Sequence, residues 1–200
     1  MSASIVVFDL GGVLVHWDPV LVWLPDMESE AAVRAFLDRI DFADKNLRAD
    51  AGERFADLAA EIDDPEDRLR LMGYVSNFAR SVPTAIEGTW TLIDRLKARG
   101  VTLHAITNWS AETFPTGRAT HPRLDTAFGV TVVSGEEKLL KPDARIFDTL
   151  CARAGVAAAD CLFIDDSARN VEGARAAGMD AVLFTTPEAL ETDLIERGLL

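Results

Sequence analysis

Acidic side chains stand at two points of this sequence where a short apolar run ends. Asp9 follows the run at 5–8 and precedes the pair Gly11–Gly12, and Asp165–Asp166 follows the run at 161–164. Adjacent carboxylates repel, so each raises the pKa of the other unless a cation lies between them. Magnesium prefers carboxylate, carbonyl and water oxygens as ligands. The acidic pair therefore predicts a Mg²⁺ site, and the glycines near Asp9 predict backbone that a ligand can approach closely.

Polar and basic residues that suit a phosphoryl group follow other segments. Thr107 and Asn108 come after the apolar run at 101–106, and their hydroxyl and amide groups can donate hydrogen bonds to phosphoryl oxygens. Lys138 and Lys141 lie just before an expected helix start, where a lysine is a point charge suited to phosphate. Each residue alone is also compatible with an ordinary turn or a solvated surface. Together they indicate one site, because ligands bind at the carboxyl ends of the strands in open parallel sheets.

Short apolar runs alternate with helical patterns along most of the chain. The runs are typical of buried parallel strands and cover residues 5–8, 101–106, 130–133, 161–164 and 181–184. The helical patterns cover residues 84–99, a segment that Pro142 opens at its first turn and Gly155 ends, and a segment from a capping Ser167 to Gly178. This alternation predicts the α/β class, with a doubly wound, Rossmann-like parallel sheet.

One long segment does not alternate. Residues 18–82 show apolar positions at helical spacing only, which predicts a helical insertion directly after the first strand. We therefore expect a core made of residues 1–17 and 83–200 and a helical segment at 18–82. Between Asp26 and Met72 the chain has 14 acidic and 7 basic residues, about half of the net charge of the whole protein.

Composition excludes several classes of protein. The 200 residues include 33 Asp and Glu against 20 Lys and Arg, a net charge of −13, which argues against nucleic acid as a partner. No apolar run reaches the ~18 residues of a membrane span, and no basic segment precedes the first apolar run, so we expect no membrane partner and a cytoplasmic protein. Cys151 and Cys161 have neither metal-type nor redox-type spacing and are expected to be reduced packing residues.

The motifs together resemble those of the haloacid dehalogenase (HAD) superfamily of hydrolases. The likeness runs from Phe8 to about Phe184 and includes a small helical cap inserted after the first strand. The subgroup resembled most holds bacterial alpha-D-glucose-1-phosphate phosphatase and the N-terminal phosphatase domain of soluble epoxide hydrolase. The stretches that carry this likeness are Asp9–Val13, Lys141–Ile146 and Asp165–Asn170.

The resemblance implies a role for each motif residue. Asp9 would be the nucleophile that forms an aspartyl-phosphate, with Thr107 and Lys141 as further catalytic residues. Substrate phosphoryl oxygens would be bound by Thr107, Asn108 and Lys141. The cofactor Mg²⁺ would be held by Asp9, the backbone carbonyl of Gly11 and one or both of Asp165 and Asp166, and Asn170 would orient the acidic pair.

Gly11 stands where phosphatases of the superfamily usually carry a second Asp, which serves as general acid and base. The glucose-1-phosphate phosphatase group shares this glycine, and the glycine carbonyl can still bind a metal. The resemblance therefore leaves open which group protonates the leaving group. The candidates for this proton donor are His16 and bulk or metal-bound water.

We expect a Mg-dependent phosphomonoester hydrolase whose partner is a small phosphorylated metabolite. A sugar phosphate is favoured over a nucleotide because the helical segment is acidic. A metal-independent 2-haloacid dehalogenase would use the same Asp9, but the paired acids favour phosphoryl chemistry. A weakly catalytic phosphate-ligand sensor or interaction module is the other alternative, and multiple-turnover hydrolysis of an aryl phosphate separates it from an enzyme. The sequence determines neither the substrate nor the oligomeric state.

Overall fold

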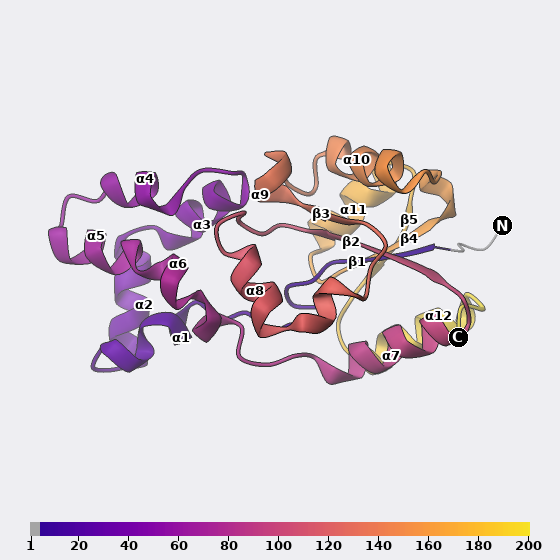
Figure 1. Cartoon of the computed structure of the whole chain (residues 1–200), viewed down its shortest axis with the longest axis horizontal. Coiled ribbons are helices and arrows are strands. Elements are labelled where there is room, and N and C mark those ends of the chain that lie inside the picture. Colours follow the sequence, from indigo (N-terminus) through magenta and orange to yellow (C-terminus); the bar gives the residue numbers. More distant parts are fainter. Residues whose placement is uncertain (1–4) are drawn as a thin grey trace.

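The computed structural model describes residues 5–200, and it contains a five-stranded parallel sheet with helices on both faces (Figure 1). The strands are β1 (Ile5–Phe8), β2 (Thr102–Thr107), β3 (Thr131–Val133), β4 (Cys161–Asp165) and β5 (Asp180–Leu183). They pair in the order β3-β2-β1-β4-β5. The predicted doubly wound α/β class is confirmed, and each predicted strand is found within one residue of its expected bounds. The first four residues of the expected core segment 1–17 lie outside the described residues.

The described residues form twelve α-helices. They are α1 (Val20–Trp23), α2 (Glu30–Arg39), α3 (Phe42–Asp50), α4 (Phe55–Ala60), α5 (Pro65–Met72), α6 (Tyr74–Asn77), α7 (Glu87–Ala98), α8 (Phe114–Thr120), α9 (Ser134–Glu137), α10 (Ala144–Ala154), α11 (Ala168–Ala176) and α12 (Pro187–Glu196). Short 3-10 turns lie at Leu24–Asp26, Phe78–Ser81, Pro122–Asp125 and Ala158–Asp160.

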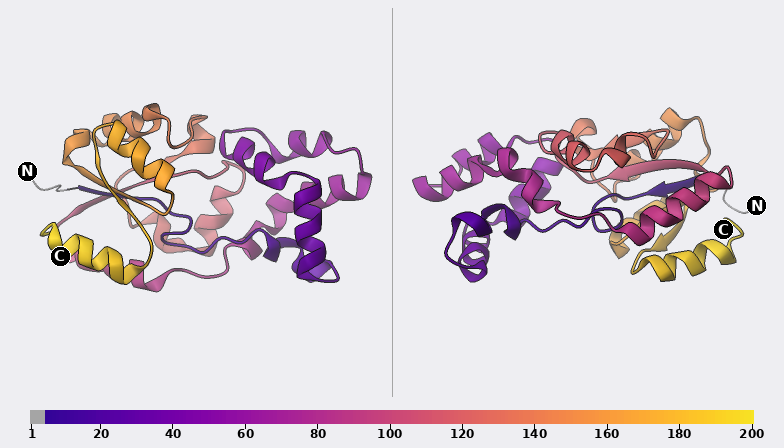
Figure 2. Two further views of the ribbon diagram at one scale, coloured as in Figure 1. Left: turned by 180° about the vertical axis from the view of Figure 1, so that it is seen from behind. Right: turned by 60° about the horizontal axis from the view of Figure 1, so that its bottom comes forward.

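Strand β1 lies at the centre of the sheet and is buried on both faces. Its side chains alternate: Val6 and Phe8 belong to the apolar cluster that includes α7 and α12, whereas Ile5 and Val7 pack with α10 and α11. Figures 1 and 2 show α10 and α11 on one face of the sheet and α7 and α12 on the other. Burial on both faces explains why the strands are continuous apolar runs and not alternating ones.

The register of the sheet brings the ends of three strands together. Phe8 is paired with Ala105 of β2 and with Ile164 of β4. All strands are parallel, so the residues that follow them emerge at the same edge. Asp9 and Asp165 therefore lie side by side at the end of β1 and β4.

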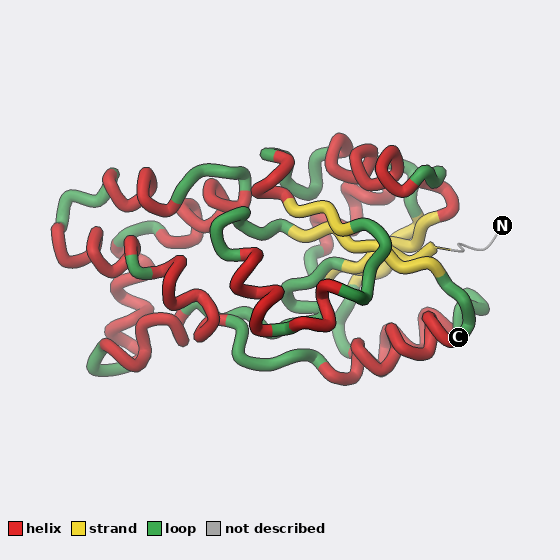
Figure 3. Tube along the Cα trace, viewed as in Figure 1, coloured by secondary structure: helices red, strands yellow, loops and turns green. Residues whose placement is uncertain are grey.

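A helical segment made of α1 to α6 lies beyond the carboxyl ends of the strands, and Figure 3 shows that it contains no strand. The chain enters and leaves this segment through two paired linkers. His16 N donates to Thr84 O at 3.0 Å, and Ile86 N donates to Leu14 O at 2.8 Å. On this ground we propose that residues 18–82 form a cap domain on the core.

The helical segment has an aromatic centre of its own. Tyr74 is fully buried and lies 4.7–5.7 Å, between ring centroids, from four other aromatic rings, which are Trp23, Phe42, Phe55 and Phe78. Phe78 in turn lies 5.7 Å from Trp109, which follows β2 in the core. Aromatic packing therefore continues from the helical segment to the edge of the sheet.

Two helix starts differ from the sequence prediction. Helix α7 begins at Glu87 and not at Thr84, because residues 84–86 bond to the first linker. Helix α10 begins at Ala144 and not at Pro142, because the Asp143 carboxylate accepts from Arg145 N and so caps the helix one residue after the proline. Ser167 stands at the N-cap of α11 as predicted, but its side chain makes no capping hydrogen bond.

None of the helices in residues 5–200 has the length and apolar character needed to cross a lipid bilayer. Cys151 and Cys161 are both free thiols, as the sequence predicted.

Replacing Tyr74 with alanine should remove the centre of the aromatic cluster and leave a cavity. Truncation of a large buried aromatic side chain costs about 3–5 kcal/mol of unfolding free energy. Leu69→Ala is the matched control, because Leu69 is 68 % exposed and its loss should change stability by less than about 0.5 kcal/mol. Denaturant unfolding of both variants tests this, and equal destabilisation would contradict it.

Candidate active site

Three carboxylates gather at the carboxyl edge of the sheet. Asp9, Asp165 and Asp166 each offer an oxygen atom, and these oxygens all lie within 4.8 Å of one another. The main chain fixes Asp9 in place, because Asp9 N donates to Ile164 O at 2.8 Å. Asp9 and Asp165 are buried, whereas Asp166 is exposed to the cavity.

A single buried lysine lies between two of these carboxylates. Lys141 Nζ is 2.8 Å from Asp9 Oδ1 and 2.7 Å from Asp165 Oδ2, and it also donates to the Ile106 carbonyl at 3.1 Å. Burial works against the charge of Lys141, but the two carboxylates outweigh burial and raise its pKa. Lys138, the other basic candidate, lies beside Gly52 of the helical segment.

The two neighbouring acids differ in how their oxygens are used. Asp165 accepts from Ser167 N at 2.8 Å, from Asn170 Nδ2 at 3.1 and 3.2 Å, and from Lys141. Asp166 accepts no side-chain hydrogen bond among the described residues and faces the cavity. The lone pairs available to a ligand are therefore on Asp166 and Asp9, while Asp165 holds Lys141 and is itself held by Asn170.

Burial raises the pKa of Asp9 above its ordinary value, and the charge of Asp165 adds to the rise, although Lys141 opposes it. Burial also raises the pKa of Asp166, again with a contribution from Asp165. Three carboxylates and one lysine leave a surplus of negative charge in a small volume. Such a set of hard oxygen donors fits a divalent cation such as Mg²⁺.

The remaining predicted residues lie around Lys141. Asn108 uses its amide to hold the lysine main chain, since Lys141 N donates to Oδ1 at 2.9 Å and Nδ2 donates to Lys141 O at 3.2 Å. Thr107 is 1 % exposed at the end of β2. Asn108 lines the cavity, whereas Thr107 and Lys141 are buried and are not among the residues that line it. The predicted residues thus gather in one place, with two of them covered.

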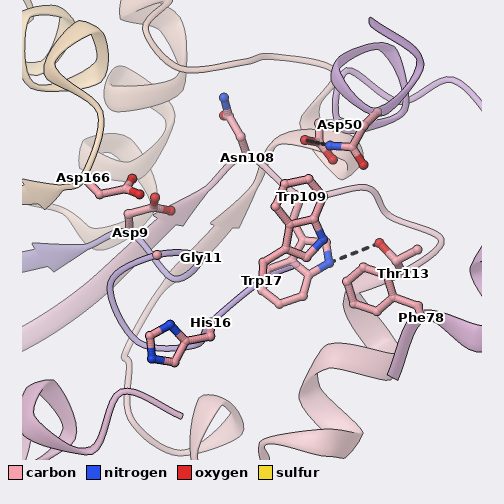
Figure 4. Close-up of a pocket in the computed structure, with 12 residues that line it drawn as sticks. Asp9, Gly11, His16, Trp17, Asp50, Phe78, Asn108, Trp109, Thr113 and Asp166 are labelled. Carbon is pink, nitrogen blue, oxygen red and sulfur yellow. Dashed lines mark hydrogen bonds between the residues drawn. The ribbon is translucent and has the colours of Figure 1, made fainter. Parts of the chain in front are cut away.

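A cavity of about 310 Å³ lies between this sheet edge and the helical segment (Figure 4). Its floor is made of Asp9, Gly11, Gly12, Asn108 and Asp166, and its walls are made of His16, Trp17, Asn46, Asp50, Phe78, Trp109 and Thr113. The wall residues other than His16 were absent from the sequence prediction. Among them, only Trp109 carries a sequence signal, because it follows Asn108 directly. The positions of Asn46, Asp50 and Phe78 depend on how the helical segment packs, and Thr113 lies in the core beside Trp109.

The two glycines after Asp9 have different constraints. Gly12 has a φ of +72°, and a Cβ added there would lie 2.2 Å from Asp166 Oδ2. A Cβ added at Gly11 would meet nothing within 4 Å, and the φ of Gly11 is not in the left-handed region. Only Gly12 is therefore required by its backbone conformation and by the close approach of Asp166.

Comparisons with known proteins agree on one family. The family model of haloacid dehalogenase-like hydrolases matches residues 3–178. The phosphatase MT3486 of Mycobacterium tuberculosis (strain CDC 1551 / Oshkosh) is 30 % identical over 220 residues, which cover 100 % of this chain and 97 % of that protein. The sesquiterpene phosphatase astK of Aspergillus oryzae (strain ATCC 42149 / RIB 40) is 28 % identical over 188 residues, which cover 90 % and 88 %.

Solved structures share the fold. The HAD family enzyme BT-2542 of Bacteroides thetaiotaomicron, in complex with magnesium and inorganic phosphate, aligns with a TM-score of 0.68 at 20 % identity over 92 % of this chain and 95 % of that chain. The 2-haloacid dehalogenase of Pseudomonas syringae pv. Tomato DC3000 aligns with a TM-score of 0.60 at 21 % identity over 92 % and 86 %.

Alanine at Gly12 and alanine at Gly11 should behave differently. Gly12→Ala forces a left-handed backbone on a residue with a side chain, at a cost of about 1–2 kcal/mol, and it also pushes Asp166 aside. Gly11→Ala should change the unfolding free energy by less than about 0.5 kcal/mol. Thermal melts of the two variants make the comparison, and a lower melting temperature for Gly11→Ala than for Gly12→Ala would refute it.

Proposed function

The chain belongs to the haloacid dehalogenase-like hydrolases and is a phosphatase-type enzyme, and from this premise we propose that it hydrolyses a small sugar phosphate through an aspartyl-phosphate, with Mg²⁺ as cofactor. The observation that carries the proposal is the position of Asp9, which lies on the cavity floor beside Asp166 and in contact with Lys141.

The residues at the sheet edge fit the proposed metal. Asp9 and Asp166 have oxygens free to face the cavity, and the Gly11 carbonyl is the further ligand that the superfamily resemblance implies. The fold relative from Bacteroides thetaiotaomicron was solved with magnesium and inorganic phosphate together. When bound, Mg²⁺ would offset the repulsion between the carboxylates and the phosphate oxygens.

Asp9 is oriented for attack through one of its oxygens. Its Oδ1 accepts from Leu10 N at 2.7 Å and lies 2.8 Å from Lys141 Nζ, so Oδ2 is the freer oxygen. In the proposed reaction Asp9 attacks phosphorus as the bond to the leaving oxygen breaks, and water then hydrolyses the acyl-phosphate to inorganic phosphate. The resemblance assigns the phosphoryl oxygens, where negative charge spreads in the transition state, to Thr107, Asn108 and Lys141. Of these, Asn108 lines the cavity and would contact the phosphoryl group directly. Lys141 already contacts Asp9, Asp165 and the Ile106 carbonyl and would act through its positive charge.

The cavity walls favour a sugar as the leaving group. Trp17 and Trp109 offer flat apolar faces, while Asn46, Asp50 and Thr113 offer polar atoms in the same wall. A sugar ring can stack on an aromatic face and bond through its hydroxyl groups at the same time. The acidic character of the helical segment disfavours a leaving group with further negative charge.

The negative charge of the three site carboxylates argues against the dehalogenase alternative. A 2-haloacid carries its own carboxylate, which would enter a site where three carboxylates already face one lysine. A phosphate with a bound metal ion does not meet this repulsion. The sensor alternative is separated from the enzyme by repeated turnover, which a binding module lacks.

Metal removal tests the cofactor. Hydrolysis of 4-nitrophenyl phosphate should stop in the presence of EDTA and return when Mg²⁺ is added in excess, because the carboxylates repel the phosphate without it. Undiminished activity in EDTA, or release of halide from a 2-haloacid, would favour the dehalogenase chemistry.

Asp9→Asn tests the nucleophile. The amide is nearly the same size as the carboxylate but cannot attack phosphorus, so kcat should fall by about 10³-fold or more. Lys141 loses one of its two charge partners in this variant, so the melting temperature should fall, but a cooperative thermal melt should show that the protein is still folded. Asp148→Asn, on the exposed side of α10, is the matched control and should keep full activity. Substantial turnover by folded Asp9→Asn protein would rule out the covalent mechanism.

A further inference from the structure

The proposed reaction needs a proton donor that the cavity floor does not supply. When the bond between phosphorus and the leaving oxygen breaks, that oxygen must gain a proton to leave as an alcohol. Gly11 has no side chain, and Asp9 and Asp166 are already assigned to attack and to the metal. The donor must therefore come from the walls.

Asp50 is a carboxylic acid in the wall opposite the nucleophile. It is the last residue of α3, and Figure 4 shows it on the far side of the cavity from Asp9 and Asp166. In-line displacement places the leaving oxygen on the side of phosphorus that faces away from Asp9. That side faces the helical segment, which presents Asp50.

The other ionisable groups in the wall fit the role less well. Of the described residues that line the cavity, Asp9, His16, Asp50 and Asp166 are ionisable. His16 is exposed on the first linker. Asp50 alone among the four belongs to α1–α6.

Contacts with both domains hold Asp50 in place. Asn46, one turn earlier on α3, donates from Nδ2 to Asp50 Oδ2 at 3.1 Å. Ser134 Oγ of the core donates to the Asp50 carbonyl at 2.6 Å and accepts from Trp109 N at 2.9 Å. The end of α3 is thus bonded to the edge of the sheet, and the carboxyl group keeps its position relative to Asp9.

We propose that Asp50 is the general acid and base of this enzyme. This inference rests on the proposed function. The carboxylic acid gives its proton to the leaving oxygen as the P–O bond breaks and the bond to Asp9 forms. Water then enters the vacated position, gives a proton to the Asp50 carboxylate and attacks phosphorus, which releases phosphate and restores both carboxyl groups.

The charges around Asp50 suit a donor near neutral pH. Burial raises the pKa of Asp50 to about 7, and the negative charge of Asp9 adds to the rise. A hydrogen bond from the Ser110 main chain and the positive charge of Lys141 act in the opposite direction and lower this pKa. His16 and Asp166 line the same cavity, and Lys138 of the core lies beside Gly52, two residues further on. The acid is protonated below its pKa, so its contribution is present at lower pH and is lost as the pH rises through about 7.

A series of substituted phenyl phosphates tests this role, because these substrates share one shape and differ in the basicity of the leaving group. Asp50→Asn should lower kcat for phenyl phosphate by roughly 10²–10⁴-fold and kcat for 4-nitrophenyl phosphate, whose leaving group needs no proton, by less than about tenfold. Asp44→Asn, on the exposed side of the same helix, is the matched control and should keep the wild-type ratio.

The wild-type pH profile is a second measurement that does not depend on the folding of a variant. Its kcat for phenyl phosphate should decline above pH 7, and its kcat for 4-nitrophenyl phosphate should not. The proposal is overturned if Asp50→Asn slows both substrates equally, if it raises only KM, or if the two wild-type profiles coincide. Failure of the wild type to hydrolyse either substrate would instead overturn the proposed function and this role with it.

Discussion

The ion pairs of Lys141 with Asp9 and Asp165 are the interaction on which the site depends. The lysine side chain is fully buried, so its charge must be paired. Removing one partner of a buried ion pair typically lowers the free energy of unfolding by about 3–5 kcal/mol. The pairing is possible only because β1 and β4 are neighbours in register and end at the same level. Asn108 at the end of β2 holds the lysine main chain from the other side. Three strands and one loop must therefore be in place together before this lysine is paired.

Much of this arrangement follows from sequence. The strands are short, continuous apolar runs, which buried parallel strands require, and the acids stand where those runs end. The helix starts were less accurate, because Asp143 caps α10 after Pro142 and the segment before α7 pairs with a linker. Neither effect is visible in apolar spacing. The roles of the two glycines were also hidden, since only the geometry shows that Gly12, and not Gly11, faces Asp166.

The cavity wall could not be predicted because it depends on the packing of the helical segment. Asp50 and Asn46 look like ordinary solvated residues of an acidic helix when the sequence is read alone. Their position is set by the aromatic cluster around Tyr74, which orients α3, and by the hydrogen bond of Ser134 to the end of that helix. Asp50 thereby comes to lie across the cavity from Asp9, which is far from it in the sequence.

The paired linkers have a consequence for how such a protein can change over time. The helical segment leaves and re-enters the core at Val15 and Ala85, which form a bridge with each other. For a segment whose ends already meet, a doubling of length adds only about 0.6 kcal/mol of closure entropy. The paired strands and the carboxylate–lysine pairs are made by residues outside this segment. The segment that carries Asn46 and Asp50 can therefore change in length without moving the strands that position Asp9 and Asp165.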